Sequence, residues 1–81
     1  MVRAYVLIEA ETGKARDVTE AVGDLRHPSA RIVSVDPIMG PYDVMALMET
    51  DDMDLLGKVV DGVRHLPGIR RTVTCLAVHL A

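Results

Sequence analysis

The stretch from Gly40 to Thr50, GPYDVMALMET, places a phenol and a carboxylate where a turn enters an apolar run. Asp43 can accept hydrogen bonds from nearby backbone N–H groups, as aspartates in turns commonly do. A carboxylate in the same position can also accept charge-assisted hydrogen bonds from a ligand. Residue type alone favours the turn role, and the two roles are compatible.

The other reactive side chains do not form a pattern typical of a metal or nucleophile site. Cys75 is the only cysteine, which excludes an intrachain disulfide and a CxxC site. Its position among apolar residues predicts a small buried hydrophobe. The three histidines lack metal-ligand spacing, and the acidic run at 51–54 is most simply a charged helix start, with a divalent cation site as the minor alternative. We therefore predict no catalytic residue, no metal and no cofactor.

Composition limits the classes of protein to which the chain can belong. Its 81 residues predict one domain, spanning 1–81. Apolar residues make up 49% of the chain, yet Tyr5 and Tyr42 are its only aromatic residues. The core must therefore be aliphatic. So much aliphatic surface on a small chain suggests that part of it is buried against another subunit.

The charge balance argues against nucleic-acid partners, and the hydropathy argues against a membrane. Nine basic and twelve acidic residues give a formal net charge of −3, whereas domains that bind DNA or RNA are normally basic. Nothing at the N-terminus resembles a signal peptide, and no apolar stretch approaches the roughly 20 residues that span a bilayer. We expect a soluble cytoplasmic protein that does not bind DNA directly.

Hydrophobic periodicity predicts six elements joined by short connections. Helices are expected over 14–26, ending at His27-Pro28, and from a cap at Thr50 or Asp51 to about 65. Pro37 predicts an edge position or a bulge, because proline cannot donate to a sheet ladder. Alternation predicts that Ile32, Ser34 and Asp36 share one face of their strand. The predicted strands span 2–10, 30–39, 42–49 and 69–80.

The order βαββαβ predicts an α+β ferredoxin-like plait, a four-stranded antiparallel sheet with two helices on one face. The strand at 42–49 is apolar on both faces, which is typical of a central strand covered on both sides. The other sheet face would carry Tyr5, Leu7, Met45 and Leu47 and would be open to water in an isolated chain. We therefore expect a homodimer that pairs these faces.

Three short motifs give the chain a family resemblance. They are Gly40 with Asp43 before the third strand, the turn Pro67-Gly68-Ile69, and Thr72 with Thr74 in the last strand. In this order and spacing the chain resembles the effector-binding (RAM) domain of the Lrp/AsnC transcription regulators, from its first strand to His79. Full members of that family place a helix-turn-helix domain before this one. The present chain starts at its first strand, so it resembles the stand-alone members.

The resemblance implies a sensor of an amino acid or a related metabolite that assembles into dimers and higher rings, octamers and decamers included. Partnering with full-length regulators of the family is compatible with it. The implied effector site is a cleft between neighbouring dimers near Gly40, where the backbone approaches the ligand and Asp43 receives its ammonium group. Tyr42 would line the site and Thr72 and Thr74 would supply hydroxyls. Backbone N–H groups at the glycine turn suit a ligand carboxylate.

Other interpretations of the same residues stay open. Thr72 and Thr74 also suit a half-buried strand, and Tyr42 also suits a dimer interface. Dimeric ferredoxin-like plaits include small monooxygenases and isomerases, whose pockets use His, Asn or Trp. This chain has no Asn or Trp and no visible nucleophile–base pair. A third class is a structural ring-forming subunit.

Overall fold

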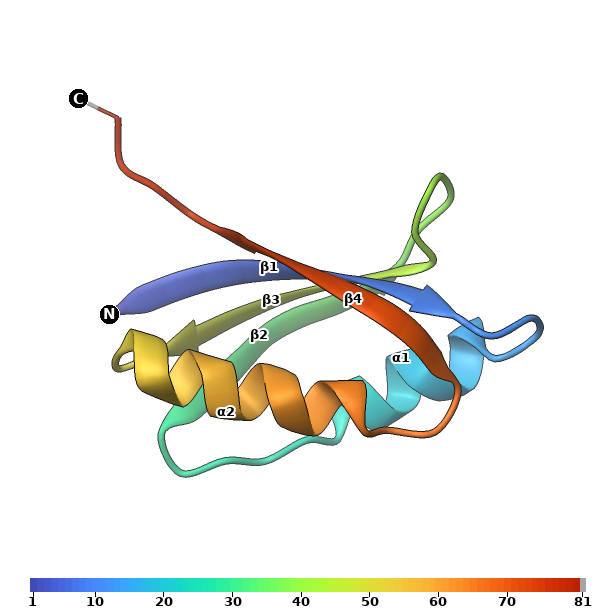
Figure 1. Ribbon diagram of the computed structural model, residues 1–81, viewed down its shortest axis with the longest axis horizontal. Helices are drawn as coiled ribbons and strands as arrows, with labels where there is room; N and C mark the ends of the chain where they lie inside the picture. The colour runs from blue at the N-terminus through green and yellow to red at the C-terminus, as the bar shows by residue number, and fades with distance from the viewer. Residues whose placement is uncertain (81) are drawn as a thin grey trace.

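Two helices cover one face of a four-stranded antiparallel sheet in the computed structural model (Figure 1), which describes residues 1–80. The strand order across the sheet is β2-β3-β1-β4. The predicted βαββαβ plait is therefore confirmed. The elements are β1 (Val2–Ala10), α1 (Ala15–Gly23), β2 (Ala30–Pro37), β3 (Val44–Thr50), α2 (Met53–Arg64) and β4 (Ile69–Leu76).

The two central strands, β1 and β3, carry the centre of the core. In each strand the residues toward the helices are mostly buried, and those toward the open side are half-buried or exposed. Valines of both helices pack onto this surface, and the core is aliphatic as the composition required. The fully buried side chains of largest volume are Ile8, Met48, Val6, Val18, Val22, Val44, Val63 and Thr50.

Strand β2 lies at one edge of the sheet, so Pro37 occupies an edge strand as predicted. The alternation predicted for this strand is wrong. A register shift lies between Ile32, which pairs with Met48, and Ser34, which pairs with Leu47. The extra residue turns Ser34 to the face opposite Ile32, because side chains alternate with period two and an inserted residue reverses the phase.

The helix ends differ from the predicted ones for local reasons. Helix α1 ends at Gly23, three residues before the predicted end, where glycine lowers helix propensity. Helix α2 is capped by Asp52, whose Oδ1 accepts a 2.9 Å hydrogen bond from the N–H of Leu55. The prediction of Thr50 or Asp51 as the cap is wrong. Thr50 is the buried last residue of β3, and its hydroxyl donates to the Asp52 carbonyl at 2.9 Å.

The turn before β4 packs tightly against the start of α1. Gly68 has a φ of +88°, a conformation that favours glycine. A Cβ added there would lie 3.2 Å from side-chain atoms of both Lys14 and Val18. The Gly68 carbonyl accepts a 2.7 Å hydrogen bond from the N–H of Glu11. Glycine is therefore required here both by backbone conformation and by packing.

The sheet face away from the helices is an apolar surface bordered by ion pairs, and we call it the open face. Tyr5 pairs with Leu47 and with Cys75. Cys75 is exposed, so the prediction that it is buried is wrong; it lies on the uncovered face of the sheet. Glu49 binds an arginine from each neighbouring strand at one end of this face. The apolar members of the open face are Tyr5, Leu7, Met45, Leu47, Val73 and Cys75.

Strand β4 ends at Leu76, before the predicted end at residue 80. Its pairing with β1 is continued by the N–H of Ala77, which donates to the Arg3 carbonyl at 2.9 Å. Beyond Ala77 the segment leaves the sheet (Figure 1), and Val78 and Leu80 are exposed. Separately, none of the helices in residues 1–80 is both long and apolar enough to cross a membrane.

Candidate functional site

The five residues predicted to bind a ligand fall into two groups. Gly40, Tyr42 and Asp43 lie in the loop between β2 and β3, and we call them the loop group. Thr72 and Thr74 lie on β4 and border a cleft beneath α2, and we call them the cleft group. Each group has its own structural setting.

Asp43 fastens the loop to the end of the sheet. Its Oδ2 accepts a 2.8 Å hydrogen bond from the N–H of Ala10. Its own N–H donates to the Ile8 carbonyl at 2.9 Å, and its carbonyl accepts from the N–H of Ile38 at 2.8 Å. One carboxylate oxygen thus serves the fold, and Oδ1 remains for a second donor because an ionised carboxylate accepts at both oxygens.

Tyr42 binds the loop to β4 through Arg71. The Arg71 Nη2 donates to the Tyr42 hydroxyl at 3.3 Å, and the Arg71 guanidinium carbon lies 5.4 Å from the centre of the Tyr42 ring. Arg71 also lies 3.6 Å from Glu9 across the β1–β4 pair. These contacts keep Tyr42 and Arg71 at the end of the open face and half-bury the phenol.

Gly40 gives the loop its turn. Its φ is +145°, which an L side chain rarely adopts. A Cβ added at Gly40 would meet no atom within 4 Å. The backbone at this position is therefore uncrowded by its own chain, so that another group can approach it.

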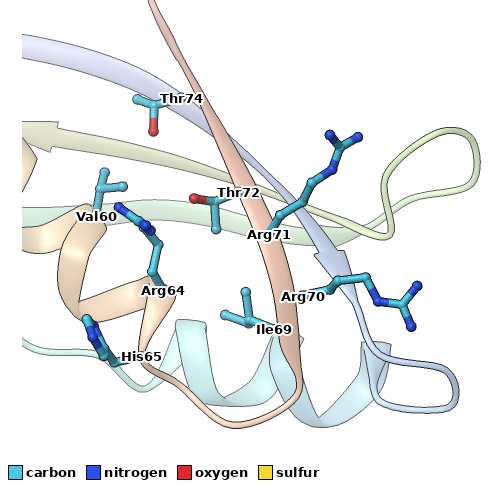
Figure 2. Close-up of a pocket in the computed structure, with 8 residues that line it drawn as sticks. All are labelled: Val60, Arg64, His65, Ile69, Arg70, Arg71, Thr72 and Thr74. Carbon is cyan, nitrogen blue, oxygen red and sulfur yellow. The ribbon is translucent and has the colours of Figure 1, made fainter.

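The cleft group faces α2. The cleft has a volume of about 430 Å³ and lies between the last turns of α2 and strand β4. Figure 2 shows Thr72 and Thr74 directed toward the helix, with the side chain of Arg64 extending from α2 toward them. Arg70 and Arg71 point away on the far side of the strand. The lining residues are Val60, Arg64, His65, Ile69, Arg70, Arg71, Thr72 and Thr74.

No carboxylate lines the cleft, although the chain as a whole is acidic. His65 contributes little to the cleft interior, because its Nδ1 lies 2.7 Å from the Asp61 carbonyl. Arg64 is the cation that the helix brings beside the two hydroxyls. Arg64 was not among the residues predicted from the sequence. Its position in the last turn of α2, facing a Thr-x-Thr strand across a short turn, is the signal that could have identified it.

The two groups do not converge within one chain. Strand β1 lies between β3 and β4, and Ile8 pairs with Val44 on one side and with Thr72 on the other. The loop group, next to β3, and the cleft group, on β4, are therefore two strand spacings of about 4.8 Å apart. Thr72 also faces the helices, whereas Tyr42 and its partner Arg71 lie at the end of the open face. The five residues thus form two spatially separate groups.

The described residues do not present a cluster of metal-ligating side chains. No three His, Cys, Asp or Glu side chains gather among residues 1–80 as a metal site. The acidic run at the start of α2 instead supplies the Asp52 cap and the first-turn carboxylate of Asp54.

Comparison with solved structures identifies proteins of the same fold and size. A protein from Thermus thermophilus is 33% identical, with a TM-score of 0.85, and the match covers 100% of this chain and 98% of the other. A protein from Pyrococcus horikoshii is 28% identical, with a TM-score of 0.80 and coverage of 99% and 93%. A search of curated proteins gave no match.

A longer protein shares the fold at low identity. AsnC of Escherichia coli is 14% identical, with a TM-score of 0.84, and the match covers 98% of this chain but 52% of AsnC. The family profile described as the Lrp/AsnC ligand binding domain matches residues 3–79. With the plait, the Gly40–Asp43 loop and the Thr72–Thr74 strand in place, the chain belongs to the Lrp/AsnC ligand-binding domain family.

Proposed function

We propose that this protein is a non-catalytic sensor that binds an amino acid or a related small metabolite at a cleft between subunits. The observation that carries the proposal is the cleft beneath α2, into which Thr72 and Thr74 point their side chains. Its volume, about 430 Å³, falls in the range of small-molecule sites. Family membership supports an effector-binding role over an enzymatic one.

The separation of the loop group and the cleft group supports a site shared between subunits, in which each group would be a half-site. A zwitterionic ligand needs an anionic acceptor for its ammonium group and donors for its carboxylate. In one chain the acceptor, Asp43, lies across β1 from the hydroxyls of Thr72 and Thr74. A second copy that brings its loop group against the first copy's cleft group would complete the set, with Gly40 offering an uncrowded backbone to the ligand.

Dimer formation through the open face supports this arrangement. That face presents adjacent apolar rows, in which Leu7 pairs with Met45 and Val73, and Tyr5 with Leu47 and Cys75. Covering such a surface with a second sheet removes apolar area from water, at roughly 25 cal/mol per Å². We propose the dimer as the unit of larger rings, octamers or decamers, and full-length Lrp/AsnC regulators as further partners.

The ligand would act by selecting an assembly. A ligand that binds one oligomer better than another shifts the population toward the first, by an amount set by the difference in affinity. Sensing of this kind requires no chemical step, so binding and assembly are the quantities to measure.

Thermal unfolding in the presence of each of the twenty amino acids tests the proposal. At a hundredfold excess over Kd, a ligand stabilises the folded state by about 2.7 kcal/mol, which raises the Tm by roughly 10–20 °C for a domain of this size. We expect at least one amino acid to raise the Tm. Failure of every amino acid, at millimolar concentration and with the oligomer intact, would contradict amino-acid sensing.

A further inference from the structure

We infer that Arg64 is the group that binds the effector's carboxylate, assisted by the hydroxyls of Thr72 and Thr74. This inference rests on the proposed function and deepens it, because it specifies the chemistry that the ligand must carry. It also assigns a binding role to a residue outside the three motifs of the family resemblance.

The geometry at the cleft supports this role. Arg64 is the last residue of α2, and Figure 2 shows its guanidinium beside Val60 on the helix side of the cleft, with Thr72 and Thr74 on the strand side. Thr72 and Thr74 lie two residues apart on β4, so both side chains project to the same side of the strand. A guanidinium and two hydroxyl side chains therefore line the same cleft.

The guanidinium of Arg64 is also uncommitted within the described chain. Four other arginines, Arg3, Arg16, Arg31 and Arg71, each have a carboxylate oxygen within 4.0 Å. Among residues 1–80, Arg64 has none. A guanidinium presents N–H donors in a planar fork that matches a carboxylate, so a free fork beside two hydroxyls is a receptor for that group.

The apolar residues that line the cleft restrict the part of the ligand that lies next to its carboxylate. Val60 from α2 and Ile69 from β4 supply aliphatic surface beside the polar groups. No lining residue is acidic. The cleft group is thus suited to a carboxylate with a small apolar neighbour, and the ligand's ammonium must find its acceptor outside this half-site.

Calorimetric titration with the best amino acid from the thermal screen tests the role of Arg64. We expect Arg64→Gln to weaken binding roughly 10- to 100-fold, as loss of a charged hydrogen-bonding partner does. Arg64→Lys should retain part of the affinity, because it keeps the charge without the fork. Arg16→Gln is the matched control: Arg16 is exposed on α1 beside Glu20, and its loss should leave Kd unchanged.

Replacing the ligand's carboxylate by a neutral amide tests the same contact through the ligand. The α-carboxamide of that amino acid should bind the wild-type protein weakly. Arg64→Gln should reduce the affinity for this carboxamide little further. Binding of the amino acid to Arg64→Gln within about twofold of wild type would overturn the inference while leaving amino-acid sensing intact.

A measurement without the effector keeps the inference separate from the proposed function. In ¹⁵N-labelled protein, acetate should move the amide signals of Thr72 and Thr74 saturably in wild type and not in Arg64→Gln. Absence of a saturable shift in wild type would overturn the carboxylate role. A negative amino-acid screen with a positive acetate titration would instead overturn the proposed effector class and retain the site.

Discussion

The carboxylate Oδ2 of Asp43 accepts a 2.8 Å hydrogen bond from the N–H of Ala10, 33 residues earlier in the chain. This bond joins the loop between β2 and β3 to the last residue of β1. One side chain therefore has a defined structural task whether or not it also meets a ligand. Separating the two tasks requires a substitution that preserves the hydrogen bond and removes the charge.

Asp43→Ala and Asp43→Asn together separate the fold role from the ligand role. Alanine leaves the Ala10 N–H without its acceptor, so we expect the free energy of unfolding to fall by about 1–2 kcal/mol. Asparagine retains an acceptor oxygen and should restore most of that loss. Chemical denaturation at fixed protein concentration measures both variants. Equal destabilisation by Ala and Asn would show that the charge matters to the fold.

The same pair tests the ammonium contact. We expect Asp43→Asn to unfold like wild type and yet lose most of the Tm increase given by the amino acid, because a neutral amide is a weaker acceptor for an ammonium group. Thermal unfolding with and without ligand provides the comparison. A full ligand-induced increase in Asp43→Asn would remove Asp43 from the ligand site.

Gly68 and Gly62 should respond differently to replacement by alanine. Gly68→Ala places a Cβ against Lys14 and Val18 at a φ of +88°, and we expect a loss of about 2 kcal/mol or more. Gly62→Ala is the matched control in an exposed part of α2, where no atom lies within 4 Å of the added carbon. It should stabilise the protein by up to about 1 kcal/mol. A neutral Gly68→Ala would contradict the packing argument.

A charge on the open face should dissociate the proposed dimer without unfolding the chain. Leu47 is half-buried on that face beside Tyr5, so Leu47→Lys would put an ammonium group into the interface. Light scattering should report a shift toward the 8.8 kDa chain, while circular dichroism stays unchanged. The control Glu20→Lys reverses an exposed charge on α1 and should leave the mass unchanged. A monomeric wild type would contradict the dimer.

Subunit mixing tests whether the two half-sites come from different chains. Homo-oligomers of Asp43→Asn or of Arg64→Gln each lack half of every site. If each site takes Asp43 from one copy and Arg64 from another, random mixing should restore about a quarter of the sites. Calorimetry on oligomers reassembled from both variants counts them. No recovery after verified subunit exchange would contradict a site that takes Asp43 from one chain and Arg64 from another.

Sequence periodicity predicted the architecture because this fold follows the local pattern closely. The bounds of β1, 2–10, and the central position of β3 could be read from apolar alternation on one or both faces. The errors arose where tertiary context decides. The extra residue between Ile32 and Ser34 has no local signature, and the choice of Asp52 over Thr50 as helix cap depends on how far β3 runs into the core.

The candidate site was only partly predictable for a similar reason. Motif order along the chain identified the loop and the Thr72–Thr74 strand, but it could not show that β1 separates them. Arg64 was missed because the cleft that it lines forms where α2 packs on β4, and its place in the last helical turn before the Thr72–Thr74 strand was the one sequence signal of that packing. The structure also gave Asp43 a specific partner, Ala10, where the sequence offered only a turn.

The exposed thiol of Cys75 allows assembly to be followed through the rate of a chemical reaction. It is the only sulfhydryl in the chain and lies on the open face beside Tyr5. If a second sheet covers that face, a thiol-specific reagent can reach the sulfur only while the subunits are apart. The rate of modification would then fall as protein concentration rises, and an effector that tightens the assembly would slow it further. The rate at which this single native thiol is modified would thus report the rate of subunit dissociation.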